Sequence, residues 1–269
     1  MNAPHEIKAS EIKTSPATSV PPGMSEQEWQ TRLELAACYR LIHHHGWTTQ
    51  VFNHITARIP ETEHLLINPF GLHYDEITAS NLLKIDIEGN LLEESEYFVN
   101  RAGYVIHSAI HMARPDLQCT LHTHSENAEA VSCLSSGFIP MTQNACIFHD
   151  RIGYHDYEGV AVDEQERQRL IADLGDTNHT LILRNHGVLI GGDSIACAYS
   201  RLYDFENGAR AQLKAMATGD RLVQLPEAVL VRTRDQFEAM ASPAGGDDRY
   251  PQWPAALRML DRLDPSWRS

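Results

Sequence analysis

The stretch CTLHTHS, residues 119–125, decides how this chain of 269 residues folds. Its alternation of apolar and β-branched residues predicts a short buried strand over residues 119–123. Side chains two residues apart on a strand point to the same face, so His122 and His124 project side by side from the strand end. Two neutral imidazoles there would be poorly satisfied in a core, and a shared metal ion removes that cost.

A second stretch, LILRNHGVLI at residues 181–190, supplies a third imidazole. Asn185 and Gly187 permit a tight turn between two apolar runs, and His186 lies within that turn. Three histidines with an open coordination position make a catalytic metal site. The sequence therefore predicts one divalent ion at these three histidines, with zinc as the default and Fe(II), Mn or Co compatible.

The rest of the chain alternates short strands with helices. The strands joined by turns too short for crossovers indicate a mainly antiparallel or mixed sheet, within a single three-layer α/β/α domain. Periodicity and capping residues predict helices over residues 25–46, 102–113, 125–134, 163–174, 194–217, 226–240 and 253–263. The predicted strands are residues 51–59, 64–67, 82–87, 119–123, 180–183 and 188–190.

Composition excludes several classes of partner. Lysine and arginine number 22 against 36 acidic residues, a formal net charge of −14. This balance argues against binding to nucleic acid or to an anionic membrane surface. The start of the chain has no signal-peptide pattern and no apolar run is long enough to cross a membrane, so we expect a cytoplasmic protein. The five cysteines lack CxxC spacing and are expected to be buried free thiols.

Several motifs together resemble the class II aldolase/adducin family over about residues 26–217. They are VFNHITARIP, LINPFGLHYDEI, HSAIHMARPD, LHTHSENAEAV, HDYEG and NHGVLIGGDS. The resemblance implies that His122, His124 and His186 bind the metal ion. It also implies a homotetramer with active sites at subunit interfaces. Residues 1–24 are rich in Ala, Pro, Ser and Thr and are expected to form a flexible arm. We expect a catalytic domain over residues 25–220 and a C-terminal helical extension over residues 221–269.

The departures from the family pattern concern the substrate pocket. The family's aldolases carry a glutamate eleven residues before the RPD motif, where this chain has Gly103. The family's phosphate-binding hydroxyls are replaced at Phe70 and Arg101, although Gly71 is kept and Asn53 matches a phosphate-loop position. This chain is therefore similar to the adducin-like branch, and we expect these five positions to bind a substrate without a phosphate group.

The groups that would act on the substrate are less sharply defined. Arg101 offers a bidentate fork for a substrate carboxylate. His107 lies four residues beyond Gly103 on the same helical face and is one candidate base. Tyr154 and His155 belong to a polar run that we expect to fold over the site as further catalytic candidates, and His149 is a weaker one.

These features predict a metal-dependent lyase, an aldolase or decarboxylase, for a small non-phosphorylated hydroxy- or keto-acid. The metal would act as a Lewis acid and stabilise a developing enolate. Two alternatives stay open: a non-haem Fe(II) oxygenase of the same fold, and an adducin-like binding protein without catalysis. The sequence does not choose the substrate, the physiological metal, the base or the fourth ligand.

Overall fold

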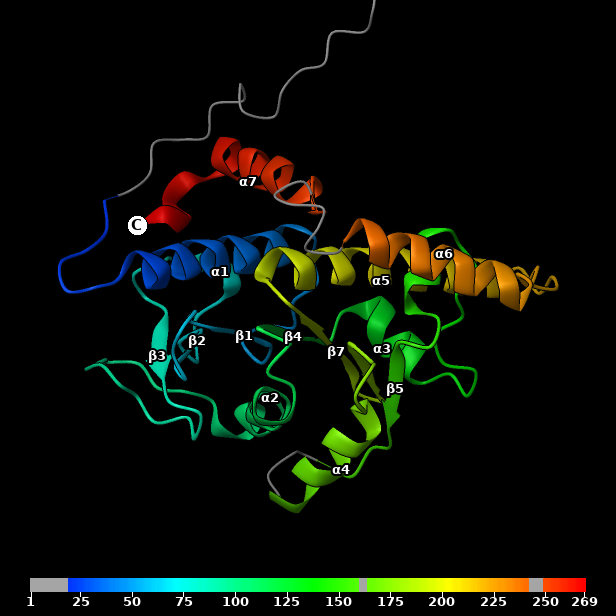
Figure 1. The fold of residues 1–269 in the computed structure, drawn as a ribbon, viewed down its shortest axis with the longest axis horizontal. Coiled ribbons are helices and arrows are strands. Elements are labelled where there is room, and N and C mark those ends of the chain that lie inside the picture. The colour runs from blue at the N-terminus through cyan, green and yellow to red at the C-terminus, as the bar shows by residue number, and fades with distance from the viewer. Residues whose placement is uncertain (1–18, 160–163, 242–248) are drawn as a thin grey trace, which may run out of the picture.

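Seven strands form one mixed sheet in the computed structural model of this chain, which describes residues 19–159, 164–241 and 249–269 (Figure 1). The strands lie side by side in the order β3-β2-β1-β4-β7-β6-β5, so β4 is central. Their bounds are β1 (His54–Arg58), β2 (Leu65–Ile67), β3 (Leu83–Ile85), β4 (Cys119–Thr123), β5 (Ile152–His155), β6 (Thr180–Leu183) and β7 (Gly187–Gly192).

All neighbouring strands pair antiparallel except β5 and β6, which are parallel. This confirms the predicted mixed, mainly antiparallel sheet. The edge strand β5 was not predicted, because Gly153 interrupts a run of only four residues and leaves no clear alternation. The polar run expected to fold over the site therefore begins inside the sheet, since Tyr154 and His155 belong to β5.

Helices cover both faces of the sheet. Figure 1 shows α1 and α5 side by side over one face, α2 and α4 at the other, and α7 outside α1. This arrangement confirms the predicted α/β/α layers. The helices are α1 (Glu26–His44), α2 (Arg101–Ala113), α3 (Glu126–Ser132), α4 (Glu164–Leu174), α5 (Ile195–Met216), α6 (Glu227–Met240) and α7 (Gln252–Leu263).

Serine side chains cap three of these helices. Ser25 accepts a hydrogen bond from the amide of Glu28, Ser125 from that of Ala128, and Ser194 from the third residue of α5. An N-cap serine satisfies an amide that the helix itself leaves unpaired. The cap at Ser125 positions the site, because it turns the chain from β4 into α3 directly after His124.

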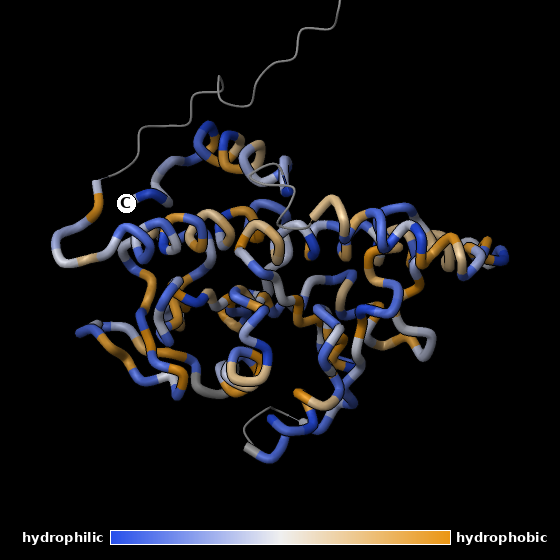
Figure 2. Tube along the Cα trace, in the orientation of Figure 1, coloured by the Kyte–Doolittle hydropathy of each residue, from blue (hydrophilic) through white to orange (hydrophobic). Residues whose placement is uncertain are grey.

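The C-terminal segment packs onto this core. Trp253, Leu260 and Trp267 are buried against the cluster that includes the apolar face of α1, and Arg40 on α1 pairs with Asp264 at 2.9 Å. Figure 2 shows apolar residues along the strands and a mostly hydrophilic α4 at the outside. Residues 249–269 are therefore part of the same packed unit as the sheet.

Two expectations about single residues are wrong. A histidine just before a short strand, such as His179, is expected from the sequence to lie in a turn or at the surface, but it is buried. Its ring lies 5.7 Å from that of Phe148 in η3, the short helical turn at Asn144–Phe148. Cys133 is exposed, since α3 ends before it, whereas the other four thiols are buried and free as expected. Within the described ranges, no helix is long and apolar enough to cross a membrane.

Candidate metal centre

His122 in β4 and His124, the residue directly after it, lie at one end of the sheet, where β4 finishes and β7 begins; we call it the metal end. β4 is buried along its whole length and pairs with β1 on one side and β7 on the other. His122 is only 2% exposed, and its Nδ1–H donates to the carbonyl of Val188 at 3.1 Å. This bond fixes the tautomer, so the lone pair of His122 lies on Nε2.

His186 reaches the same place from the turn between β6 and β7. Asn185 adopts a left-handed backbone with φ 55°, which its short polar side chain tolerates. The amide of His186 is shared between the carbonyl of Leu183 at 3.1 Å and the hydroxyl of Ser132 at 3.2 Å. The last residue of α3 therefore holds the turn that presents the third imidazole.

The structure brings the three predicted ligands together. The ring centroids of His122, His124 and His186 lie 4.6 to 4.9 Å apart. The Nε2 atoms of His122 and His124 approach to 2.7 Å, and one ring nitrogen from each histidine lies within 4.8 Å of the others. Three nitrogens at this spacing are the donor set that a divalent zinc-like ion takes in proteins.

Burial keeps these imidazoles uncharged near neutral pH. It lowers the pKa of His122 well below its usual range and that of His124 to about 4, with the neighbouring imidazoles adding to both shifts. Burial lowers the pKa of His186 as well. A neutral imidazole offers a lone pair whereas a protonated one does not, so the residues fit a metal ion.

A second group of histidines lies behind the triad, and His107 is the only member that the sequence analysis singled out. The ring of His54 on β1 is 5.3 Å from that of His122, and its Nδ1 is bonded to Nε2 of His107 at 2.8 Å. Thr56 joins Nδ1 of His107 and Nε2 of His111, each at 2.7 Å. All four side chains are buried.

The four side chains form a hydrogen-bonded row, which we call the imidazole row, and its hydrogen bonds all run in one direction. A hydroxyl has one proton, so Thr56 donates to one imidazole and accepts from the other, and each neutral imidazole likewise carries one N–H. The tautomer of His54 is therefore coupled to that of His111. Among the described residues, His107 reaches the triad only through His54, which makes it a positioning residue in this geometry; its direct catalytic role stays a prediction.

The spacing of these four residues in the sequence indicates which of them share a face. His54 and Thr56 alternate on one face of a strand, and His107 and His111 are four residues apart on one face of a helix. Local spacing does not show that β1 pairs with β4, and this pairing places His54 opposite His122. That pairing joins segments 68 residues apart, so a local pattern does not predict it.

The predicted substrate-binding positions also lie at the metal end. Asn53 is 1% exposed; its Oδ1 accepts from the amide of Thr49 at 2.6 Å, and its Nδ2 has no hydrogen-bond partner among the described residues. Phe70 and Gly71 form the turn after β2, where Gly71 has φ 98°.

Arg101 and Gly103 begin α2, but the side chain of Arg101 lies outside the part of the chain that the structure describes. The roles of both residues stay predictions.

The two candidates on β5 have other contacts. Tyr154 stacks under the guanidinium of Arg184 at 4.3 Å, and its hydroxyl accepts from the amide of Phe138. His155 is bonded through Nδ1 to Asp173 at 2.7 Å. Their predicted catalytic roles stay predictions. The side chain of this segment that approaches the triad is Tyr157, whose ring lies 6.3 Å from that of His186.

The weaker candidate, His149, lies away from these groups. It pairs through Nε2 with Glu227 on α6 at 2.8 Å. That contact gives it a role in holding α6.

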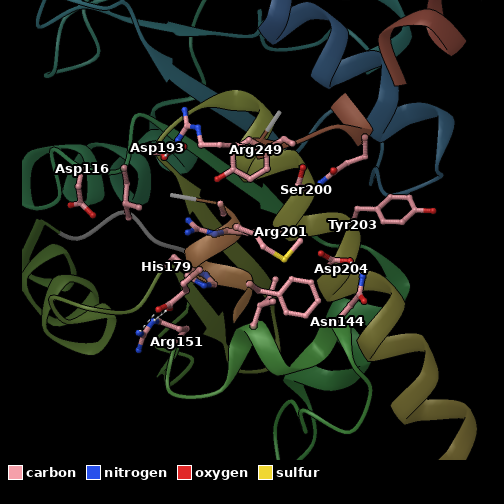
Figure 3. A pocket seen from close by; sticks show the side chains of 18 of the residues that line it. Asp116, Asn144, Arg151, His179, Asp193, Ser200, Arg201, Tyr203, Asp204 and Arg249 are labelled. Carbon is pink, nitrogen blue, oxygen red and sulfur yellow. Dashed lines mark hydrogen bonds and ion pairs between the residues drawn. The ribbon is translucent and has the colours of Figure 1, made fainter. Parts of the chain in front are cut away.

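A cavity of about 630 Å³ lies at the opposite end of the sheet, where β6 begins and β7 ends. Figure 3 shows it with Arg201 near the centre of the view, between His179 and Tyr203. Three of its four arginines are paired with carboxylates of the same cavity: Arg114–Asp116, Arg151–Glu238 and Arg249–Asp193. It shares no lining residue with the triad, from which β7 separates it by roughly 17 Å.

A family model described as the class II aldolase and adducin N-terminal domain matches residues 33–213. A protein of Pseudomonas aeruginosa named only as an aldolase class 2 protein is 44% identical over 245 residues, which cover 91% of this chain and 94% of that protein. Mouse alpha-adducin is 37% identical over 246 residues, which cover 86% of this chain but only 33% of adducin.

Among solved structures, an L-fuculose 1-phosphate aldolase from Glaciozyma antarctica superposes with a TM-score of 0.78 at 28% identity. The match covers 93% of this chain and 97% of that aldolase. The fold described above, with its sheet order and helical layers, is therefore shared over nearly the whole length of both chains.

Proposed function

This chain belongs to the class II aldolase and adducin family, and on that premise we propose that it is a divalent-metal-dependent lyase for a small, non-phosphorylated hydroxy- or keto-acid. The observation that carries the proposal is the triad: His122, His124 and His186 offer three uncharged nitrogens within 4.8 Å of one another at an accessible sheet end. A protein that served only as a scaffold would have no use for such a donor set.

His122, His124 and His186 would hold the ion. When bound, a divalent ion supplies Lewis-acid polarisation of a substrate oxygen. Zinc is our first choice, because three imidazoles are a common zinc donor set. The carbonyl of Val188 supports this role, since it holds His122 in the tautomer that leaves Nε2 free.

Other residues at the metal end favour a substrate without phosphate. The Nδ2–H of Asn53, which has no partner in the described part of the chain, is a donor for a substrate oxygen. Phe70 stands in the turn where a phosphate-binding site would need a hydroxyl, and phenylalanine has none to donate. We keep Arg101, the first residue of α2, as the proposed clamp for a substrate carboxylate. Aldol cleavage and decarboxylation both suit such a substrate.

The active site is proposed to be completed by neighbouring copies in a homotetramer. His124 and His186 are partly exposed, so the triad has an open side. On this proposal a second copy of the chain lines that open side.

Two other functions have support from the same observations. The adducin relative favours a binding protein without catalysis. The three-histidine site also suits Fe(II), although the usual iron oxygenase site includes a carboxylate. Metal content separates the first alternative from the lyase, and oxygen consumption with Fe(II) and a keto-acid separates the second.

The first experiment measures metal in the purified chain and in the variant His186→Ala. We expect about one zinc per chain, and at least a hundredfold weaker binding in the variant, because even outer partners of metal ligands are worth about 10- to 100-fold. The variant His64→Ala, at a histidine with no part in the triad, is the control and should keep its metal.

The same preparations should have a light-scattering mass near four chains. A chain that takes up no Zn, Mn or Fe(II) would contradict the lyase and the oxygenase together. A mass near one chain would contradict the shared active site.

A further inference from the structure

Three phenylalanine side chains lie against one another at the metal end. Phe52 precedes β1, Phe70 follows β2, and Phe98 precedes α2. The ring of Phe70 is 6.4 Å from that of Phe52 and 5.6 Å from that of Phe98. Phe52 is 50% exposed and Phe98 is 61% exposed, so the described chain leaves much of this aromatic surface uncovered.

The backbone holds the three rings in place. The amide of Phe70 donates to the carbonyl of Phe98 at 3.0 Å, which ties the turn after β2 to the segment before α2. Gly71, with φ 98°, lets the chain reverse directly after Phe70. The aromatic surface is therefore built by three separate segments and does not belong to one flexible loop.

Strand register places this surface beside the triad. β1 begins at His54, which is the register partner of His122, and β2 ends at Ile67, the partner of Thr56. Residues just before β1 and just after β2 consequently lie at the end of the sheet where β4 presents its histidines. The hydroxyl of Thr49 also donates to the carbonyl of His124 at 3.0 Å, which fastens the loop before Phe52 to the metal ligand.

An independent observation points to a ligand here. Asn53 follows Phe52 directly, and its Oδ1 is oriented by the amide of Thr49, which assigns Nδ2 as the donor. That Nδ2 is buried and has no partner among the described residues. Native proteins rarely leave a buried donor unpaired, and a substrate oxygen would satisfy it.

We propose that Phe52, Phe70 and Phe98 form a subsite for an aromatic side group of the substrate, whose oxygen atoms are held by Asn53 and the metal end. The inference rests on the proposed function and names its substrate class: an aryl-substituted hydroxy- or keto-acid. An aromatic ring matches the occupant because rings pack edge-to-face or offset at the spacing that these three already show. A phosphate group would meet three apolar rings and no hydroxyl.

The test compares phenylpyruvate with pyruvate as probes, measured by calorimetry or ligand-observed NMR on the full-length, zinc-loaded chain. We expect phenylpyruvate to bind about tenfold more tightly or better, because its ring buries apolar surface that pyruvate lacks. The variant Phe70→Ser should reduce this preference to about twofold or less.

The variant Phe237→Ser is the matched control, because Phe237 is a half-buried ring that lines the cavity at the opposite end. It should keep the full preference for phenylpyruvate. Equal binding of both probes, or a preference that Phe70→Ser leaves intact, would overturn the subsite while the metal content still supports the lyase.

A loss of oligomer mass in Phe70→Ser would show instead that the rings contact a second copy of the chain, and it would overturn the subsite too. A chain that binds no metal and neither probe fails the proposed function itself, and the inference with it. The variant Phe70→Leu is a control for misfolding. It keeps an apolar side chain and should retain most of the preference for phenylpyruvate.

Discussion

Thr56 is the residue that links the buried imidazole row of His54, His107 and His111. Its one hydroxyl is bonded to nitrogens of both His107 and His111, and no solvent reaches it. A side chain of the same shape without the hydroxyl would leave two buried ring nitrogens unsatisfied. The stability of the fold and the orientation of His54 therefore both depend on the hydroxyl oxygen of Thr56.

We predict that Thr56→Val lowers the free energy of unfolding by about 2–6 kcal/mol, since each of the two unsatisfied buried nitrogens costs about 1–3 kcal/mol. Urea unfolding monitored by circular dichroism measures the change. Thr56→Ser keeps the hydroxyl and should lose markedly less. Equal losses in the two variants would show that the methyl group, and not the hydrogen bonds, carries the effect.

At the scale of the element, the start of β7 is where the three histidines proposed as metal ligands meet: His122 in β4, His124 directly after β4, and His186 directly before β7. Gly187 faces β4 so closely that a Cβ atom there would lie 2.5 Å from the backbone carbonyl of Thr123. A backbone atom cannot move aside as the end of a flexible side chain does. Any side chain at this position must push β7 away from β4, and His186 moves with it.

We predict that Gly187→Ala weakens zinc binding by about tenfold or more, as expected when the support of a ligand is displaced. Competition with a chromogenic chelator measures this. Gly191→Ala is the control on the same strand: its Cβ would meet the flexible side chain of Leu117 at the opposite end. It should destabilise the fold without changing zinc affinity, and an equal effect of both would contradict the explanation.

For the whole molecule, buried neutral histidines make stability depend on pH. Burial lowers the pKa of His111 to about 3 and those of His107 and His179 well below their usual range. In the unfolded chain these imidazoles take up protons below about pH 6.5. The unfolded state then binds more protons than the folded state, so stability falls as pH falls from 6.5 toward the folded pKa values.

We predict a loss of about 1 kcal/mol for each of these three imidazoles between pH 7 and pH 5.5, measured by urea unfolding of the metal-free chain. Burial raises the pKa of Glu206, which acts in the opposite direction. The variant Glu206→Gln removes that contribution and should show at least as large a loss. Equal stability at the two pH values would contradict the prediction.

The mixed sheet and the triad can be predicted from sequence patterns, whereas the order of the strands was not predicted. The spacing of His122 and His124 on a buried strand and the turn at His186 predict the ligands without any tertiary information, because strand periodicity alone fixes their direction. The mixed sheet and its helical layers were predicted in the same way, from short connections and apolar periodicity. The family resemblance agrees with both.

The parts that local patterns do not predict depend on contacts between distant segments. The opposition of His54 and His122 comes from the pairing of β1 with β4, and the contact of Phe70 with Phe98 comes from a turn meeting a loop. β5 is too short to show a period, and His179 is buried by a helical turn that precedes it by thirty residues or more along the chain. Tertiary packing decides each of these.

The single exposed thiol has a practical consequence. Cys133 is the only one of the five cysteines that is exposed, and the side-chain amide of Asn185, the residue before His186, donates to its sulfur at 3.6 Å. A nitroxide or fluorophore that reacts with thiols would therefore attach at one position, without engineering, beside the triad. Paramagnetic Mn(II) at the histidines would broaden the spectrum of such a nitroxide, which turns an incidental cysteine into a reporter of site occupancy.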